Sequence, residues 1–345
     1  MMQISPETQL FIREHSSDDV RVLALQAKKY PDIDMPTAIT QIAGRKVAAE
    51  KIPSWWEIEK IWYPKHLSLE QCSSEITARY KARLLQGDSL TDLTGGFGID
   101  CSFLATGFKS TTYVERQEEL CEIAAHNFPV LNLNHINIKN EDGVTYLQAM
   151  SPVDCLFLDP ARRNEHGGKT VAISDCEPNV AELEELLLQK ANRVMIKLSP
   201  MLDLSLALKE LKQTQEVHIL SVNNECKELL ILLGQTSPAE ISIHCVNLFT
   251  KGTQKEQHFV FTREQEQCSE CTYTDSLETY LYEPNASLLK AGAFRSIAAA
   301  YPVRKLHPNS HLYTSDTFIE NFPGRIFRIV NQCSFNKKEV KENLA

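Results

Sequence analysis

Long apolar runs are absent from this sequence of 345 residues. No stretch approaches the roughly eighteen consecutive apolar residues of a membrane-spanning helix, and the start of the chain has no basic segment followed by an apolar one. Internal repeats and low-complexity tracts are also missing. Because 43% of the residues are hydrophobic, the chain can bury a core, and its length favours two or three domains. We therefore expect a cytoplasmic protein with no membrane partner.

Closely spaced cysteines are scarce. The ten cysteines are spread singly along the chain, apart from Cys268 and Cys271. A tetrahedral zinc site there would need a second pair of cysteines or two histidines at matching spacing, and none follows. Single cysteines in apparent strands and helices are typical of small buried hydrophobes in a reducing compartment. The sequence predicts neither a disulfide framework nor a bound metal.

An overall excess of basic residues is also absent, since the net charge is −9. Residues 285–345 differ from the average, with nine Lys or Arg against four Asp or Glu and hence a net charge of +5. Contacts with nucleic-acid phosphates need clustered Lys and Arg. Two interpretations of this basic tail stay open, namely RNA contact and a solvated face of ordinary helices.

The first part of the chain, residues 1–85, has no strand-like alternation. Spaced apolar positions predict helices over residues 18–30, 36–52 and 68–85. Ser68 and Gln71 have the spacing of a capping box, which predicts that the third helix begins at Ser68. We expect a helical N-terminal domain here.

From Leu90 onward, short apolar runs alternate with amphipathic helices, the pattern of a parallel sheet covered on both faces. The predicted strands are residues 90–94, 111–115, 136–139, 153–159, 193–198, 217–222 and 229–233. This order predicts a Rossmann-like, seven-stranded α/β core over residues 86–236. The last two strands are too close for an intervening helix, so we expect them to form an antiparallel hairpin at the edge of the sheet.

The remaining chain reads as a small α+β region. Residues 240–250 and 257–262 predict a hairpin, residues 286–300 a helix and residues 325–330 a strand. A further helix begins at Asn336 without a C-terminal cap before the chain stops. We expect that the chain ends inside a domain.

A glycine loop follows the first predicted strand and opens a helix, in the segment Asp92-Leu93-Thr94-Gly95-Gly96-Phe97-Gly98. Glycines at such a turn let the backbone approach a nucleotide closely. Glu115 ends the next strand, where a carboxylate can accept hydrogen bonds from two ribose hydroxyls. Asp142 follows the third strand and either contacts an adenine or caps the next helix. A dinucleotide fingerprint fits less well, because Cys101 stands where it requires Gly or Ala.

The fourth predicted strand runs into Asp159-Pro160-Ala161-Arg162-Arg163. This acid–proline turn lies at the carboxyl end of a strand beside the switch point of the sheet, the usual location of catalytic groups. The planar guanidinium groups of the two arginines can stack on a base or bind a phosphate. Alternatively they pair with local acids such as Glu165 or Asp175. The polar loop of residues 164–169 can move over a substrate, and its His166 is a possible proton acceptor.

Together these motifs resemble the class I S-adenosylmethionine-dependent methyltransferases, in family order across residues 70–233. The loop D-x-T-x-G-x-G-x-D with the later V-E-R is similar to bacterial ribosomal RNA guanine-N2 methyltransferases. Ser74-Glu75-x-Thr77-Ala78 resembles the segment of trimethylguanosine synthases that closes over the methionine end of the cofactor. The whole layout, including Tyr282-Glu283-Pro284-Asn285 and Pro323-Gly324-Arg325, resembles the THUMP-like-domain methyltransferases of Bacteroidetes-type bacteria.

This resemblance implies a domain order and a reaction. Residues 237–321 would contain a ferredoxin-like segment, and residues 322–345 the beginning of a THUMP-like module. The reaction would be methyl transfer from S-adenosylmethionine to rRNA or tRNA, at an exocyclic amine such as guanine N2. Asp159 and the Pro160 carbonyl would hold the amine, because the task is mainly to orient its lone pair. Ala161 and Arg162 depart from the second proline and the aromatic residue of amine methyltransferases.

Two other functions stay open. Ribose 2′-O methyltransferases of this fold deprotonate a hydroxyl with two lysines, an aspartate and a glutamate. Asp159, Lys197 and Glu228 have suggestive positions for this chemistry, although Lys81, the remaining lysine, is close to the glycine loop. Lys197 is also a candidate substrate-binding residue, together with Arg162 and Arg163. The alternative is a purely structural role, in which Lys197 caps a strand and Glu228 is a solvated edge residue. The other function is a non-catalytic, cofactor-binding scaffold that associates with RNA.

Overall fold

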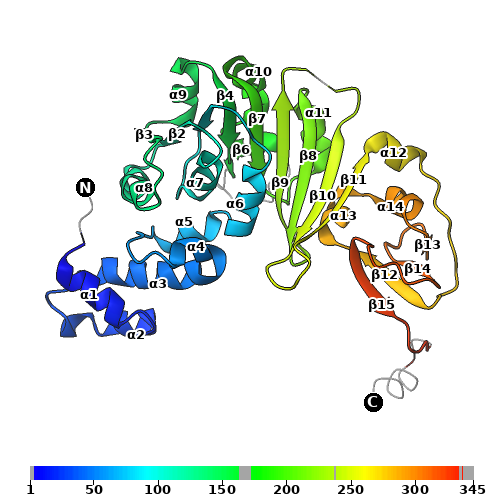
Figure 1. The fold of residues 1–345 in the computed structure, drawn as a ribbon, viewed down its shortest axis with the longest axis horizontal. Coiled ribbons are helices and arrows are strands. Elements are labelled where there is room, and N and C mark those ends of the chain that lie inside the picture. The colour runs from blue at the N-terminus through cyan, green and yellow to red at the C-terminus, as the bar shows by residue number, and fades with distance from the viewer. Residues whose placement is uncertain (1–3, 163–171, 237, 334–335, 337–345) are drawn as a thin grey trace. The chain divides into compact units, whose positions relative to one another are not determined.

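The computed structural model describes residues 4–162, 172–236, 238–333 and 336. It divides into two compact units (Figure 1). The first consists of Met1–Lys197, Lys209–Gln213 and Leu232–Gln235, and the second of Leu198–Leu208, Thr214–Ile231 and Thr236–Ala345. Among the described residues, no helix is both long enough and apolar enough to cross a bilayer.

The first unit begins with short helices. They are α1 (Pro6–Glu14), α2 (Val20–Leu25), η1 (Ala27–Lys29), α3 (Met35–Lys51), α4 (Pro53–Trp56), α5 (His66–Gln71) and α6 (Glu75–Ala82). Phe11, Leu23 and Ile42 are among the residues that pack α1, α2 and α3 together. The predicted single helix over residues 68–85 is wrong, because the chain is extended at Cys72 and Ser74. Ser68 therefore lies inside α5, and Ser74 precedes the first residue of α6.

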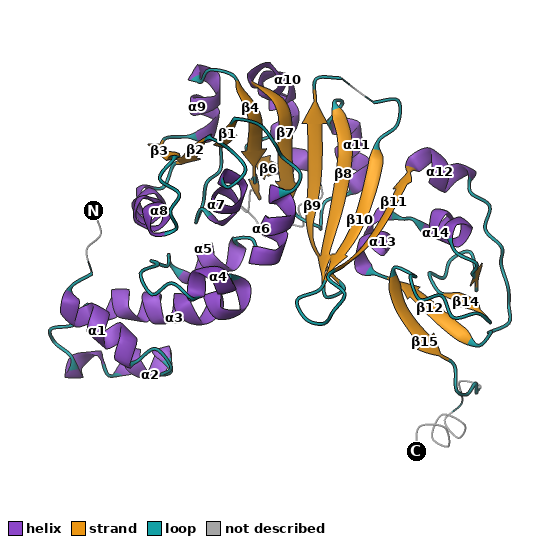
Figure 2. Cartoon of the chain, viewed as in Figure 1, coloured by secondary structure: helices purple, strands orange, loops and turns teal. Residues whose placement is uncertain are grey.

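The sheet of the first unit contains five parallel strands in the order β7-β4-β1-β2-β3. Their bounds are β1 (Ser89–Asp92), β2 (Ser110–Glu115), β3 (Ile136–Asn140), β4 (Val153–Leu158) and β7 (Ala191–Leu198). The helices between them are α7 (Ile99–Ala105), α8 (Glu118–Val130), α9 (Gly143–Ala149) and α10 (Val180–Lys190). Figure 2 shows α7 and α8 on one side of these strands and α9 and α10 on the other. Between β4 and α10 lie β5 (Ala161–Arg162), η2 (Ile173–Asp175) and β6 (Cys176–Glu177).

The second unit contains strands in the order β11-β10-β8-β9. They are β8 (Thr214–Val222), β9 (Glu225–Gly234), which begins in this unit, β10 (Ser242–Leu248) and β11 (Glu256–Thr262). The predicted hairpin of β10 and β11 is confirmed by their antiparallel pairing. The prediction that the preceding two strands form an edge is wrong, because β10 pairs with β8 in parallel and extends the sheet. Helix α11 (Leu204–Glu210) precedes β8.

A smaller sheet follows, with strand order β13-β14-β12-β15. The elements are α12 (Arg263–Cys268), β12 (Tyr280–Pro284), α13 (Ala286–Ala291), α14 (Phe294–Ala300), β13 (Arg304–Lys305), β14 (Tyr313–Ser315) and β15 (Gly324–Arg328). The single helix predicted over residues 286–300 is two helices, because Gly292 adopts φ +77° and ends α13. The helix expected after Asn336 lies outside the described residues. The predicted fold class, mixed α/β with a mainly parallel sheet and a small C-terminal α+β region, is confirmed.

Candidate functional site

Neighbouring strand ends bring an acid and a lysine together in the first unit. Asp159 directly follows β4, and Lys197 is the penultimate residue of β7. Leu158 is in register with Ile196, so the residues that follow them lie side by side. The Nζ atom of Lys197 is 2.5 Å from Oδ2 of Asp159. The structure thus joins the predicted catalytic carboxylate to Lys197, which the sequence offered as a substrate-binding residue or as part of a 2′-O site.

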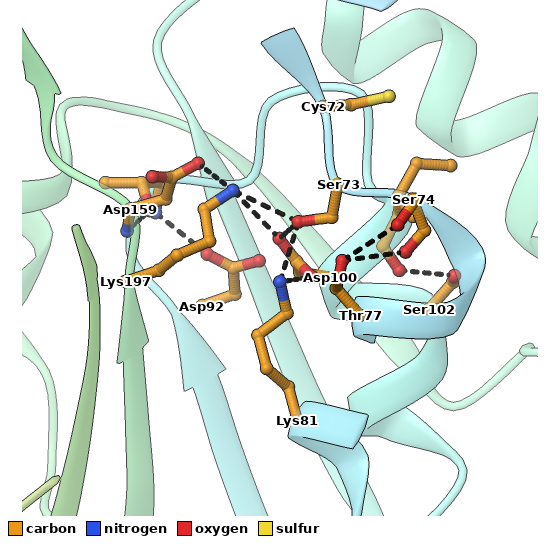
Figure 3. A network of polar contacts seen from close by, with 12 residues as sticks. Cys72, Ser73, Ser74, Thr77, Lys81, Asp92, Asp100, Ser102, Asp159 and Lys197 are labelled. Carbon is orange, nitrogen blue, oxygen red and sulfur yellow. Dashed lines mark hydrogen bonds and ion pairs between the residues drawn. The ribbon is translucent and has the colours of Figure 1, made fainter. Parts of the chain in front are cut away.

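A buried polar network extends from this pair (Figure 3). The Ser73 hydroxyl donates to Oδ2 of Asp100 at 2.7 Å and accepts from Lys81 at 2.7 Å and from Lys197 at 3.1 Å. Lys81 Nζ also lies 2.9 Å from Oδ1 of Asp100, and Lys197 Nζ lies 3.4 Å from Oδ2. Two lysines and one carboxylate therefore surround one serine hydroxyl, and Lys197 connects this group to Asp159.

The two carboxylates of the network have different environments. Burial alone would raise the pKa of Asp100, but the nearby ammonium groups of Lys81 and Lys197 lower that pKa to about 2. Burial raises the pKa of Asp159, and Lys197 counteracts the rise. The Asp159 side chain is 37% exposed, whereas that of Lys197 is 8% exposed. Asp100 is a fixed internal counterion, while Asp159 is the member of the network that solvent or a substrate can reach.

Asp92, at the end of β1, is the most deeply buried acid near the glycine loop. Its Oδ1 atom accepts a hydrogen bond from the Thr94 amide at 3.0 Å. Its Oδ2 atom is buried and has no hydrogen-bond partner among the described residues. Burial raises the pKa of Asp92 to about 8, the Thr94 amide only partly offsets this, and the nearby Asp100 carboxylate adds to it. At pH 7 this carboxyl group therefore holds a proton in the folded chain.

The glycine loop adopts a conformation that other residues would strain. Gly96 and Gly98 have φ values of +54° and +86°. A Cβ atom on Gly95 would lie 2.2 Å from the ring of Tyr113, so no larger residue fits there without movement. At Gly96 the nearest atom to such a Cβ would be the Thr94 carbonyl oxygen at 3.8 Å, so the space beside Gly96 is open. The backbone at Gly96 therefore borders free space, and a bound nucleotide requires such close access to the backbone.

Glu115 is the last residue of β2, and Asp142 follows β3 at the same edge of the sheet. Glu115 accepts hydrogen bonds from the amides of Gly96 at 2.9 Å and Gln117 at 2.8 Å, one on each carboxylate oxygen. Each oxygen has a further lone pair for a ligand hydroxyl. Asp142 caps α9, because its Oδ1 atom accepts from the amides of Val144 and Thr145, both at 3.0 Å. The capping alternative for Asp142 is thus correct, and its Oδ2 atom is not part of that cap.

Ser74 and Glu75, at the start of α6, contact residues of α6 and α4. The Ser74 hydroxyl is 3.2 Å from that of Thr77. Glu75 accepts from the Ser54 amide at 2.8 Å and forms an ion pair with Arg79 at 2.7 Å. Glu75 thereby connects α6 to α4, and its carboxylate is engaged in that contact.

The structure describes only some of the remaining residues that the sequence predicts for the site. Arg162 lies on β5, which pairs with β6 and has Arg162 in register with Cys176. Arg163 and His166 lie outside the described residues. Glu228 is buried in β9, in the second unit, and is not a solvated edge residue.

Sequence reasoning missed the roles of Ser73 and Asp100. Asp100 is the last acid of the D-x-T-x-G-x-G-x-D motif and occupies the first turn of α7, but the motif alone did not identify its partners. Lys81 was judged too close to the glycine loop, yet it is fully buried and forms an ion pair with Asp100. The spacing of Thr77 and Lys81 could have indicated that Lys81 is buried, because residues four apart share one helix face and Thr77 lies on the buried one.

Comparisons with known proteins identify the family. A family model described as a ferredoxin-like domain matches residues 280–323. The chain is 34% identical to a candidate methyltransferase from Porphyromonas gingivalis W83, with a TM-score of 0.86 over 99% of this chain and 86% of that one. The chain belongs to this methyltransferase family.

More distant solved structures share less with the chain. A modification subunit of a candidate type I restriction enzyme from Vibrio vulnificus YJ016 is 12% identical, covering 58% of this chain and 56% of that one with a TM-score of 0.40. A candidate methyltransferase from Streptococcus mutans, solved in complex with SAH, is 14% identical, covering 46% and 96% with a TM-score of 0.34. Likenesses of this size carry no argument about function. No curated protein matches the chain.

Proposed function

We propose that this protein is an S-adenosylmethionine-dependent methyltransferase that acts on rRNA or tRNA, at a base exocyclic amine such as guanine N2. The observation that carries the proposal is the Asp159-Pro160 turn after β4, whose carboxylate contacts Lys197 at 2.5 Å. This turn follows the strand next to β1, and the glycine loop follows β1. Cofactor and reacting group would therefore meet at one edge of the sheet.

The residues of the glycine loop fit such a cofactor. S-adenosylmethionine supplies a methyl group on a positively charged sulfur. Glu115 would accept hydrogen bonds from the ribose hydroxyls, and Asp142 would contact the adenine with the oxygen that does not cap α9. The open space beside Gly96 and the unpartnered Oδ2 atom of Asp92 support this fit. Thr94, Gly95 and Gly98 would shape the loop, while Ser74 and Glu75, at the start of α6, would lie near the methionine end of the cofactor.

Asp159 and the Pro160 carbonyl would hold the two N–H groups of the target amine. The ionised carboxylate is the stronger acceptor and the form that can take up a proton, and burial opposes ionisation of Asp159. Lys197 offsets this effect and also limits the directions in which the carboxylate can accept. As the amine nitrogen gains the methyl group it loses a proton, and Asp159, the partly exposed carboxylate of the network, would accept it. In this reaction Lys197 is a positioning residue.

The proposed RNA substrate has support from charge and from the domain order. The basic residues of the region 285–345 include Arg325 and Arg328 on β15. Arg162 and Arg163 would stack on a base or bind a phosphate beside the Asp159 turn. We further propose that the chain consists of a helical domain over residues 1–85, a catalytic domain over 86–236, a ferredoxin-like region over 237–321 and a THUMP-like segment over 322–345.

Ribose 2′-O methylation is the second candidate, favoured by the buried contact between Lys197 and Asp159. In that reaction a neutral lysine would take the proton of a hydroxyl. Lys197 lies between two carboxylates, Asp159 and Asp100, and such neighbours favour the charged form of a lysine. The amine reaction needs this charged form, so it agrees better with the observed contacts.

The test is methyl transfer to RNA from a strain that lacks this gene. The purified full chain is incubated with that RNA and methyl-labelled S-adenosylmethionine, and the digested nucleosides are identified by mass spectrometry. We expect N2-methylguanosine, and no transfer to RNA from the parent strain, which already carries the modification. Asp159→Ala should abolish transfer and leave cofactor affinity within a few fold. Asp88→Ala is the matched control, because Asp88 is an exposed acid that pairs with Lys109.

The other outcomes each select a different function. A 2′-O-methylated nucleoside would replace the amine reaction with the second candidate. Cofactor binding without transfer to RNA would favour the scaffold. Full turnover by Asp159→Ala would reject the assigned catalytic site.

A further inference from the structure

Three strands of the second unit carry histidines on one face of their sheet. His218 on β8 is in parallel register with His244 on β10, so the two side chains lie on the same face. Glu216 precedes His218 by two residues and shares that face. On β11, Val260 is in register with His244, and His258, two residues away, also shares the face. The pairing of the strands therefore brings one carboxylate and three imidazoles together.

The ligand atoms of this group are close enough to share an ion. One ligand atom each from Glu216, His218 and His244 can be chosen so that all three lie within 4.8 Å of one another. His218 Nε2 lies 3.3 Å from Oε2 of Glu216. His244 Nδ1 lies 3.1 Å from Nε2 of His258. Ligands bound tetrahedrally to zinc at about 2.0–2.2 Å are roughly 3.3–3.6 Å apart. The Glu216–His218 and His244–His258 contacts are already at or below this spacing, and rotation of the side chains would bring the remaining ligand atoms to it.

The arrangement of the rings leaves one side of the group open to solvent. The rings of His218 and His244 are stacked, with centroids 4.3 Å apart, and those of His244 and His258 are 5.3 Å apart. His218 is buried, whereas the Glu216 side chain is 33% exposed and His258 is exposed. An ion can therefore enter from the side of Glu216 and His258 and bind against the buried imidazole.

We propose that Glu216, His218 and His244 bind one divalent transition-metal ion of the Zn²⁺ type, with His258 as the fourth ligand. Imidazole nitrogens favour zinc, nickel or copper, whereas magnesium and calcium prefer sites made only of oxygen atoms. The single carboxylate supplies a negative charge that partly balances the ion. Four ligands that are all side chains correspond to a closed, structural site.

Such an ion would link β8, β10 and β11, which are held together otherwise by backbone hydrogen bonds and packing. The ligands all belong to the second unit, and none is part of the proposed methyl-transfer site. The inference is independent of the proposed function, since it rests on a different set of residues. A metal ion at these residues would replace the sequence-based expectation of no metal, which rests on Cys268 and Cys271.

The experiment is a metal titration of the untagged full chain after treatment with a chelator and desalting. We expect one equivalent of Zn²⁺ per chain in isothermal titration calorimetry and a rise in the melting temperature on binding. Co²⁺, used as a spectroscopic probe, should show tetrahedral absorption without thiolate charge transfer. Addition of chelator should reverse both effects.

Variants identify the ligands. Glu216→Gln and His244→Ala should each weaken Zn²⁺ affinity by at least about tenfold. Matched controls are Glu225→Gln, an exposed acid on β9 that pairs with Lys227, and His311→Ala, an exposed histidine. Both should bind as the parent chain does.

A fallback variant is needed in case one of these substitutions prevents folding. If His244→Ala does not fold, as judged by circular dichroism, His258→Ala replaces it because His258 is exposed. Binding that survives Glu216→Gln together with a histidine variant would overturn the proposal. So would the absence of stoichiometric binding, or its loss in Cys268→Ser with Cys271→Ser.

Discussion

Removal of the Lys197 ammonium tests the role of the Asp159 contact most directly. Lys197→Met keeps the length of the side chain but removes the charge that lies 2.5 Å from Oδ2 of Asp159. Asp100 retains Lys81 at 2.9 Å, so the buried network keeps one complete ion pair and the chain should still fold. We expect that Asp159 then takes up a proton at higher pH than in the parent chain, because burial still favours its neutral form.

The size of the effect follows from the contact distance. Two unit charges 2.5 Å apart interact by about 6.6 kcal/mol at an effective dielectric constant of about 20. Because the Asp159 side chain is 37% exposed, solvent screens this to roughly half, or about 3 kcal/mol. A difference of about 1.4 kcal/mol corresponds to one pH unit. The acid limb of the pH–rate profile should therefore move upward by about 2 pH units.

The assay is the rate of methyl transfer to the RNA of the deletion strain, measured between pH 5 and pH 9 under single-turnover conditions. Lys197→Arg retains the charge and should restore much of the parent profile. Lys109→Met is the matched control, because Lys109 is an exposed lysine that pairs with Asp88. If Lys197→Met lowers the rate equally at every pH, the ammonium does not keep Asp159 ionised and the reasoning is refuted.

Three further predictions concern the glycine loop. Glu115→Ala should weaken cofactor affinity by at least about tenfold in calorimetry, since a ligand hydroxyl loses a charged acceptor. An unchanged affinity would show that Glu115 is not part of the cofactor site. The pKa of Asp92 is raised to about 8, so the folded chain keeps a proton that the unfolded chain releases, and stability should fall as pH rises from about 4 to about 8. Asp92→Asn should remove most of that slope in thermal unfolding, and a parallel slope in both proteins would contradict the assignment. Gly95→Ala should lower the melting temperature, because its Cβ would lie 2.2 Å from the Tyr113 ring, and an equal melting temperature would indicate that Tyr113 moves freely.

Local sequence signals were enough to predict the strand ends and therefore part of the site. Parallel strands align their carboxyl ends at one edge of a sheet, so Asp92, Glu115 and Asp159 could be assigned to that edge from their positions alone. Asp142 had two local interpretations. Only the hydrogen bonds of its Oδ1 atom decided that it caps α9.

Contacts between distant segments could not be predicted in this way. The helix expected over residues 68–85 is interrupted at the extended segment around Ser73, whose hydroxyl donates to Asp100, a residue 27 positions later. The helix pattern continues through this break, so periodicity gave no indication of it. The sequence places Lys81 close to the glycine loop, but it does not show that its ion-pair partner, Asp100, lies on another helix.

The sequence by itself therefore determined the α/β class, the glycine loop and the acid–proline turn, because these depend on short-range patterns of apolar residues, glycines and strand ends. The tertiary structure decided which charges meet. Lys197 contacts Asp159 and Asp100 because β4 and β7 are adjacent and in register, while the extended chain at Ser73 lies against α7. In the second unit, the pairing of β8, β10 and β11 aligned histidines that are 26 and 14 residues apart. Side-chain proximity of this kind depends on strand order and register, which a single sequence specifies only through the complete fold.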